Sequence, residues 1–208
     1  MINTSYQETA ITTILKHNSF KNNIVRQIFL NDKILALLPI SNDKTSIVFS
    51  VKNDLKKISD NFVKRKIKFY VKDFLKNIKF STKLEYKDLF FLVRSKYFTD
   101  RTLLFGEALH VLHPFVGQGF NMTLRDLESL KKILSKKINL GLDIGSSDIL
   151  SEFSNETKPR NFMFSVGSDI LKSSLFYKES TDSIFKILNR SNFAKNVFFN
   201  VADRGLIF

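Results

Sequence analysis

The residues best placed to do chemistry lie near the middle of the chain, where two glycines flank a glutamine. The run Gly117-Gln118-Gly119 directly precedes an apolar stripe of helical spacing that begins at Phe120. Glycine permits a positive φ and lets a ligand approach the backbone closely. The free amides of residues 119–121 would point out of the helix N-terminus, which favours negative charge. The pattern predicts a binding site for a ligand edge that carries or develops negative charge.

A carboxylate lies just upstream of these glycines. Gly106-Glu107 follows a short apolar strand predicted over Thr102–Phe105. Glu107 can accept hydrogen bonds from sugar or ribityl hydroxyls, or it can supply the N-terminal charge of a short helix over Ala108–Leu112. Pro114 fixes the approach of the loop and offers a flat apolar surface. Together these features suit a cofactor with an electron-accepting ring and a polyol arm. A flavin is such a cofactor, because its N1–C2=O edge becomes negative on reduction.

Four further polar side chains of this segment leave alternatives open. His110 and His113 lie three residues apart, but no third ligand of usual spacing is near, so we expect no metal site. As neutral imidazoles they can orient loop carbonyls or line a pocket. Asn121 and Arg125 can bind the cofactor or the loop, or they can cap the helix and pair at its surface. No serine has a G-x-S-x-G context, so a nucleophilic triad is not indicated.

The first fifty residues have the pattern of an antiparallel β-meander. Segments rich in β-branched and apolar residues alternate with turn-forming residues at 17–19, 31–33 and 41–44. The predicted strands are Ala10–Lys16, Ile24–Leu30, Ile34–Leu38 and Ser46–Val51. Residues 1–7 show no clear start of their own, so we expect a sheet whose other strands lie elsewhere. Tyr86–Phe98 is expected to be extended, with a buried strand over Leu89–Val93.

Helical spacing dominates the later segments. Apolar residues recur between lysines from Leu55 to Ile78, with Asp54 or Ser59 as the N-cap. A second apolar stripe runs from Phe120 to Ile138, with acids early and lysines late, as the helix macrodipole favours. A third helical region begins at Asp148, and Pro159 is expected to break or kink it. Exposed phenylalanines in the C-terminal part are expected to face another part of the protein or a membrane; these are Phe193, Phe198, Phe199 and Phe208.

Composition limits the class of protein. The chain has 208 residues, 43% of them hydrophobic, which is enough for a core, and it has no cysteine. Its net charge is +13, but the basic residues are spread along the chain and accompany abundant Asn, Ile and Phe, as in an AT-rich coding sequence. We therefore expect no nucleic-acid partner, while a basic face resting on an anionic membrane is the further interpretation. The absence of a signal-peptide pattern and of an apolar run of about 18 residues predicts a cytoplasmic protein.

The central segment resembles the second flavin-binding motif of the FAD-dependent aromatic hydroxylases of the p-hydroxybenzoate hydroxylase class. That motif is Gly-Asp-Ala-Ala-His, His-Pro, Gly-Gln-Gly-x-Asn and an Arg-Asp pair, and the match is long and in order. Within this class, the Gly-Gln-Gly-x-Asn form with Leu-Arg-Asp is similar to the ubiquinone-biosynthesis hydroxylases. The matching residues here are Gly106-Glu107-Ala108-Leu109-His110, His113-Pro114, Gly117-Gln118-Gly119-Phe120-Asn121 and Arg125-Asp126. Tyr6-Gln7, Ala10, Phe29-Leu30 and Ala36-Leu37-Leu38-Pro39 resemble the substrate-domain sheet of that subfamily.

The resemblance implies an FAD site with no catalytic side chain. Glu107 would meet the ribityl or pyrophosphate region of FAD, with glutamate in place of the family's aspartate. Pro114 to Asn121 would line the isoalloxazine. The cofactor would perform the chemistry, the transfer of one oxygen atom to an electron-rich ring, while the protein positions that ring and excludes water. The implied cofactor-binding residues are Gly106, Glu107, His113, Pro114, Gly117, Gln118, Gly119, Phe120 and Asn121.

The chain departs from the family pattern at its N-terminal side. It contains no G-x-G-x-x-G of the βαβ unit that binds the ADP part of FAD in this family. We therefore expect Met1 to fall inside a longer reading frame and the N-terminal FAD-binding half to be missing. The expected fold class is α+β, a fragment of an α/β flavoprotein monooxygenase without the Rossmann unit. The expected parts are residues 1–98, a substrate-domain sheet and helix; residues 99–140, the second FAD motif and helix; and residues 141–208, a helical region.

The leading prediction is the C-terminal part of a monooxygenase that uses FAD and NAD(P)H to hydroxylate a polyprenylated aromatic precursor of ubiquinone. By resemblance, its substrate implies contact with the inner face of the membrane or with a ubiquinone-biosynthesis assembly, while the fragment alone would be inactive. Two alternatives stay open. One is a different flavin hydroxylase with a soluble substrate. The other is a non-catalytic basic remnant or interaction module.

Overall fold

The computed structural model describes residues 1–30, 33–53, 59–114 and 117–175, which form two compact units. One comprises Ser5–Leu89 and is called the sheet unit below. The other comprises Met1–Thr4 with the chain from Phe90 onward and is called the helical unit. Two long strands, β1 (Ile2–Lys16) and β6 (Glu85–Val93), have residues in both.

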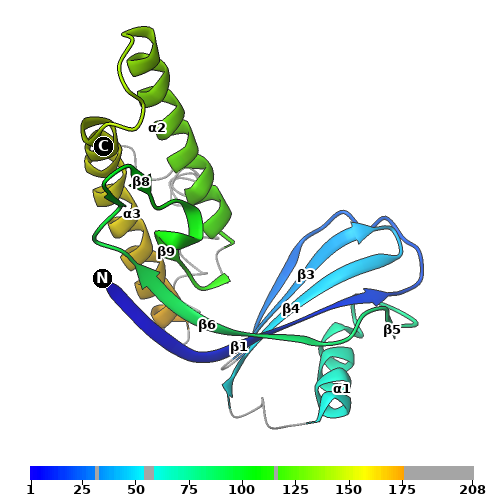
Figure 1. Cartoon of the computed structure of the whole chain (residues 1–208). Helices are drawn as coiled ribbons and strands as arrows, with labels where there is room; N and C mark the ends of the chain where they lie inside the picture. Colours follow the sequence, from blue (N-terminus) through cyan, green and yellow to red (C-terminus); the bar gives the residue numbers. More distant parts are fainter. Residues whose placement is uncertain (31–32, 54–58, 115–116, 176–208) are drawn as a thin grey trace, which may run out of the picture. The chain divides into compact units, whose positions relative to one another are not determined.

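The sheet unit contains the predicted antiparallel meander (Figure 1). Its strands lie in the order β2-β3-β4-β1, and β5 (Lys79–Phe80) also pairs with β1. The other bounds are β2 (Arg26–Leu30), β3 (Lys33–Ser41) and β4 (Lys44–Lys52). The prediction of four strands is confirmed, but β1 begins at Ile2 rather than Ala10. It reaches back past the apolar run because Glu8 and Thr9 stay in register with Lys52 and Val51 of β4, and because β1 also pairs with β6 on its other side.

Helix α1 (Asp60–Val71) covers one face of this sheet (Figure 1). Its buried side chains Val63, Ile67 and Val71 join the apolar core of the sheet unit. The predicted helix extended to Ile78, which is wrong: Phe74 and Leu75 bond back to the carbonyl of Val71 in a turn that ends the helix. Ser59 is the N-cap without a side-chain cap hydrogen bond. Residues 54–58, including the alternative cap Asp54, lie outside the described residues.

The helical unit surrounds a second core with short strands and two long helices. Its elements are β7 (Phe98–Thr99), β8 (Thr102–Leu103), the 3-10 helix η2 (Gly106–Ala108), β9 (His110–Val111), α2 (Gly119–Asn139) and α3 (Ser147–Leu175). The C-terminal end of β6 pairs with β9. The buried residues Tyr97, Leu109, Ile133, Ile149 and Phe153 form the centre of this core. The helix predicted from Phe120 to Ile138 is confirmed.

Pro159 does not break the third helix, so one of the two outcomes expected from the sequence, a break, is wrong. Helix α3 runs from Ser147 to Leu175 and contains this proline. Proline cannot donate the hydrogen bond to the carbonyl four residues earlier. Here Phe153 and Asn161 are buried on either side of it, so packing holds the helix together across the missing bond. The phenylalanines expected near the C-terminus lie outside the described residues.

A buried carboxylate joins three elements of the helical unit. Asp126 of α2 is fully buried and accepts a hydrogen bond of 2.9 Å from His110 Nε2 of β9. Asn161 Nδ2 of α3 lies 2.9 Å from both of its oxygens, and Arg160 Nη2 lies 3.3 Å from Oδ1. A buried charge is stable only when it is paired and hydrogen-bonded. Asp126 therefore stabilises one arrangement of β9, α2 and α3.

A second ion pair joins the turn between β7 and β8 to the connection between α2 and α3. The guanidinium of Arg101 donates to both oxygens of Asp143, at 2.6 and 2.9 Å. The amide of Gly145 donates to the same carboxylate at 2.9 Å. The hydrogen bonds from Arg101, followed by that from Gly145, lower the pKa of Asp143 from 3.8 to about 2. The folded state therefore stabilises the ionised carboxylate of Asp143 relative to its protonated form.

We predict that Asp126→Ala strongly destabilises the chain. Removing one partner of a buried ion pair typically costs about 3–5 kcal/mol, since the remaining donors stay buried without their acceptor. Glu128→Ala is the matched control, because Glu128 is exposed on the same helix and its removal should change stability by no more than about 0.5 kcal/mol. Urea unfolding followed by circular dichroism measures both. Equal urea midpoints for the two variants would contradict the role of Asp126.

We also predict that the stability of the folded chain falls at acid pH because Asp143 becomes protonated. Because its folded-state pKa is depressed, its stabilising contribution is present above the unfolded value and is lost as the pH falls from 3.8 to about 2. Asp143→Asn should therefore have a lower urea midpoint than the wild-type chain at neutral pH, and this difference should vanish across that window. A difference that persists at pH 2 would show that the ionised carboxylate is not its source.

Candidate functional site

The candidate site is built on the segment that passes from η2 through β9 to the N-terminus of α2. Gly106 opens η2 with a φ of 60°, a conformation that glycine adopts without strain. It is buried, and a Cβ built on it would lie 3.5 Å from Cγ2 of Thr123 in α2. The start of η2 therefore packs directly against the helix whose N-terminus carries the glycine turn.

Glu107 lies in the first turn of η2 and is exposed. The sequence allowed this carboxylate to be the N-terminal charge of a helix over Ala108–Leu112. That helix does not form, because η2 ends at Ala108 and β9 begins at His110, where it pairs with β6. The structure leaves Glu107 as a solvent-facing acceptor beside the loop, in a position to accept hydrogen bonds from hydroxyl groups.

The N-terminus of α2 is open. Its N-cap, Gln118, makes no side-chain cap hydrogen bond, and the first turn contains no acidic residue. Gly117 has a φ of 61°, and its amide donates to the carbonyl of Pro114 at 3.0 Å, which closes the turn before the helix. A Cβ built on Gly117 or Gly119 would meet no atom within 4 Å in the described part of the chain, neighbouring residues aside. The backbone here is therefore accessible to a ligand, and the helix dipole favours negative charge on that ligand.

Two side chains of the first turn of α2 complete this surface. Asn121 Nδ2 donates to Oε1 of Gln118 at 3.1 Å, so these amides orient one another. Phe120 is 71% exposed, which is unusual for a large apolar side chain at the start of a helix. An exposed ring beside open amides can cover the apolar face of a ligand while the amides contact its polar edge.

The side chains of both histidines are buried. His110 is held by Asp126 rather than by loop carbonyls, and its Nδ1 has no hydrogen-bond partner among the described residues. His113 is 3% exposed and directly precedes Pro114. The described residues contain no group of three or more side chains suited to a metal ion.

Arg125 lies half-buried on α2 with its guanidinium 4.8 Å from the centre of the Phe164 ring. Burial lowers the pKa of Arg125, and the nearby cation Arg160 lowers it further, whereas Asp126 raises it. Tyr97 approaches the same network through Asn161 Nδ2, at 3.5 Å. Burial is the main cause of the raised pKa of its hydroxyl. The surroundings of Asp126 are therefore dry, and this strengthens each of its polar contacts.

Asn161 and Arg160 are the residues that sequence reasoning missed. They lie 35 and 34 positions after Asp126 and belong to a different helix. The available signal was an acid at helical spacing from Met122 and Ile133, at Asp126, together with a histidine in the preceding strand. Neither identifies a partner on α3, because that pairing depends on how two helices pack.

The chain matches a known protein family over most of its length. The family described as the FAD binding domain matches residues 2–161, which include the sheet unit, the helical unit as far as Asn161 and the whole candidate site. Among the described residues, no helix has the length and apolar character needed to cross a membrane.

Curated relatives and solved structures agree with this match. The chain is 24% identical over 155 residues to a ubiquinone hydroxylase, UbiM, of Neisseria meningitidis, covering 73% of this chain and 34% of the relative. It is 28% identical over 203 residues to the human ubiquinone biosynthesis monooxygenase COQ6, covering 80% and 43%. A crystal structure of PqsL, a probable FAD-dependent monooxygenase from Pseudomonas aeruginosa, matches with a TM-score of 0.69 at 16% identity, covering 89% and 53%.

The chain thus spans less than half the length of these curated relatives. The solved structure is too distant in sequence to show more than a shared fold. The family match, by contrast, extends over residues 2–161, and the glycine turn, the open helix N-terminus and the exposed carboxylate lie inside it. The chain belongs to the FAD binding domain family.

Proposed function

We propose that this chain is the C-terminal part of an FAD-dependent monooxygenase that hydroxylates a polyprenylated aromatic precursor of ubiquinone. The observation that carries the proposal is the motif between Gly106 and Asn121, whose residues follow one another in the order of the related flavin motif and lead to the uncapped N-terminus of α2. It lies inside a member of the FAD binding domain family. The names of the curated relatives, ubiquinone hydroxylase and ubiquinone biosynthesis monooxygenase, support the substrate class.

The residues of the candidate site fit FAD. An uncapped helix N-terminus without acidic side chains suits the electron-rich edge of the isoalloxazine, and the open space at both turn glycines allows the ring to approach. When bound, a reduced flavin supplies the activation of dioxygen and the transfer of one oxygen atom to the substrate ring. The residues that would hold it are Gly106, Glu107, His113, Pro114, Gly117, Gln118, Gly119, Phe120 and Asn121.

Each part of the segment has a separate task in this proposal. The amides of residues 119–121 stabilise negative charge at the edge of the reduced ring. Glu107 accepts hydrogen bonds from the polyol arm, with one methylene more than the aspartate of the related motif. Phe120 and Pro114 shield an apolar face from water. None of these side chains needs to act as an acid or base in the reaction.

The proposal extends to the complete protein. NAD(P)H reduces the flavin, and an N-terminal half with a dinucleotide fold binds the ADP part of FAD. Residues 1–98 hold the substrate and residues 99–140 hold the flavin, while helix α3 supports the flavin-binding part through the contacts of Arg160 and Asn161 with Asp126. The protein works in the cytoplasm, peripherally at the inner membrane or within a ubiquinone-biosynthesis assembly, because its prenylated substrate partitions into lipid.

A chimera tests the function. The chain is joined to the N-terminal portion of the Rhodospirillum rubrum ubiquinone hydroxylase UbiL, of which it covers 40%. We expect the purified chimera to retain FAD and to restore ubiquinone in a bacterial strain that lacks its own ring hydroxylase, as measured by mass spectrometry of extracted quinones. Retained FAD without ubiquinone, but with turnover of a soluble phenol, would favour a hydroxylase of another substrate. A well-folded chimera without FAD would contradict the proposal.

Gly119→Ala separates flavin binding from stability. Alanine is favoured over glycine in a helix by up to about 1 kcal/mol, and the added methyl group meets no atom within 4 Å among the described residues beyond its neighbours, so the urea midpoint should stay the same or rise. In the chimera, a methyl group against the ring should cost about 1–3 kcal/mol of binding, or about fivefold to 100-fold in FAD affinity. Unchanged FAD affinity would show that the ligand does not approach this backbone.

Glu107 provides a second, independent measure of the same site. A hydrogen bond to a charged group contributes about 1.5–3 kcal/mol, so Glu107→Ala should weaken FAD binding by about 10-fold to 100-fold in the chimera. Glu107→Asp, which introduces the residue of the related motif, should keep affinity close to the original. Glu128→Ala is the control for removing an exposed acid. Equal affinities for all variants would exclude a role for Glu107.

A further inference from the structure

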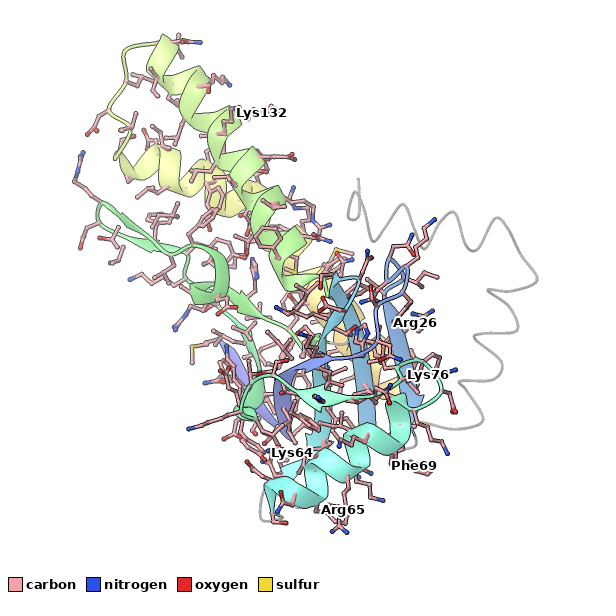
Figure 2. The ribbon with its side chains drawn as sticks, turned by 90° about the vertical axis from the view of Figure 1, so that its right-hand side faces the viewer. Arg26, Lys64, Arg65, Phe69, Lys76 and Lys132 are labelled. Carbon is pink, nitrogen blue, oxygen red and sulfur yellow. The ribbon has the colours of Figure 1, made fainter. Side chains whose placement is uncertain are left out.

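The sheet unit has a strongly cationic surface that the candidate FAD site does not use. Between Asp60 and Phe80 the chain contains seven cationic residues and two acidic ones, a local net charge of +5. Figure 2 shows Lys64, Arg65 and Phe69 along α1, with Lys76 on the segment that follows it and Arg26 labelled on the sheet. The name cationic face is used below for Lys64, Arg65, Lys66, Lys68, Lys72, Lys76 and Lys79 with Phe69 and Phe74.

Part of the cationic face is the outer side of the amphipathic helix α1, and Phe74, Lys76 and Lys79 lie on the segment after it. Val63, Ile67 and Val71 point into the core of the sheet unit. Arg65, Lys68, Phe69 and Lys72 follow one another at helical spacing on the other side, and all four are exposed. The apolar side of α1 is thus already occupied by the sheet, and the charged side remains as a surface for a partner.

Large aromatic side chains are exposed among these charges. Phe69 is 60% exposed and Phe74 is 40% exposed. Lys72 Nζ lies 4.7 Å from the centre of the Phe69 ring, and Arg26 Cζ lies 5.5 Å from that of Phe74. Exposed rings beside snorkelling cations are typical of helices that lie in the interface of an anionic bilayer, where the ring enters the headgroup region and the cation stays at its surface.

An apolar pocket of about 200 Å³ lies under the same helix. Its walls are mainly apolar or aromatic side chains of the sheet and of α1, and two lysines complete them. The lining residues from α1 are Phe62, Val63, Lys66 and Tyr70, and those from the sheet are Ile11, Lys33, Phe49 and Val51. An apolar pocket with cations in its wall suits an anionic amphiphile. Nucleic acid, which also binds cationic surfaces, has no aliphatic part to place there.

We propose that the cationic face binds the surface of an anionic lipid bilayer, with Phe69 and Phe74 entering the headgroup region. The inference deepens the proposed function, on which its biological purpose rests, because a hydroxylase with a prenylated substrate must meet that substrate at a membrane. The binding itself depends only on residues of the sheet unit. In this proposal, α1 and the segment after it are the part of the chain that contacts lipid.

Vesicle flotation with the full 208-residue chain tests the proposal. We expect the chain to float with phosphatidylcholine vesicles that contain phosphatidylglycerol and to remain behind with phosphatidylcholine alone. The floating fraction should fall in about 1 M salt, where the Debye length shrinks to about 3 Å. Failure to float with the anionic vesicles at low salt would overturn the proposal.

Two charge-reversal variants locate the surface. Arg65→Glu/Lys68→Glu/Lys72→Glu and the control Lys131→Glu/Lys132→Glu/Lys136→Glu each reverse three exposed cations, so both lower the net charge from +13 to +7. Each cation near an anionic surface contributes about fivefold to partitioning, so the α1 variant should bind at least about 100-fold more weakly. The control on α2 should retain most of its binding. Equal losses would show that only the total charge matters and would overturn the assignment to α1.

Phe69→Ser distinguishes a membrane from nucleic acid. The position is exposed in the protein, so circular dichroism should show an intact fold. Vesicle binding should fall about tenfold, because the variant lacks the ring that enters the headgroup region. Unchanged vesicle binding, together with equally tight, salt-dependent binding of arbitrary duplex DNA, would assign the face to nucleic acid and overturn the proposal. None of these measurements requires flavin. A chimera without FAD would therefore contradict the proposed function alone, and a chain that does not float would contradict the membrane proposal alone.

Discussion

The helical unit depends on how the charge of Asp126 is satisfied. A carboxylate with no solvent exposure is costly unless donors surround it, and here the donors come from three elements: His110 of β9, and Asn161 and Arg160 of α3. Any other packing of these elements would leave the charge without partners. This one requirement therefore selects the relative position of the strand before the glycine turn and the two helices behind it.

The same helix carries both this anchor and the open end of the candidate site. Asp126 lies two turns into α2, whereas Gly119 begins it, so the buried network fixes the direction in which the first amides point. The packing of Gly106 against Thr123 adds a second link between η2 and α2. A ligand site needs a rigid backbone behind an accessible surface, and this arrangement provides both: the polar network is dry, while the glycine turn faces open space.

The sheet unit shows how the same composition can be read in two ways. Abundant lysine, asparagine and phenylalanine is consistent with an AT-rich coding sequence, and most basic residues of the chain are dispersed. On α1 the core residues occupy one side, which gathers Arg65, Lys68 and Lys72 on the other with Phe69 between them. Helical geometry, rather than the number of lysines, therefore gives this surface its chemical character.

Local patterns in the sequence determined most elements of the fold and the identity of the flavin motif. The four strands of the meander, the helix from Phe120 to Ile138 and the glycine turn follow from spacing and turn residues, which act over a few positions. The extent of β1, the end of α1 at Val71 and the continuation of α3 through Pro159 were decided by the tertiary structure. So was the pairing of Asp126 with Asn161 and Arg160. The physical reason is that strand register and buried charge pairing join residues far apart in the chain, and their energies do not exist until the elements pack.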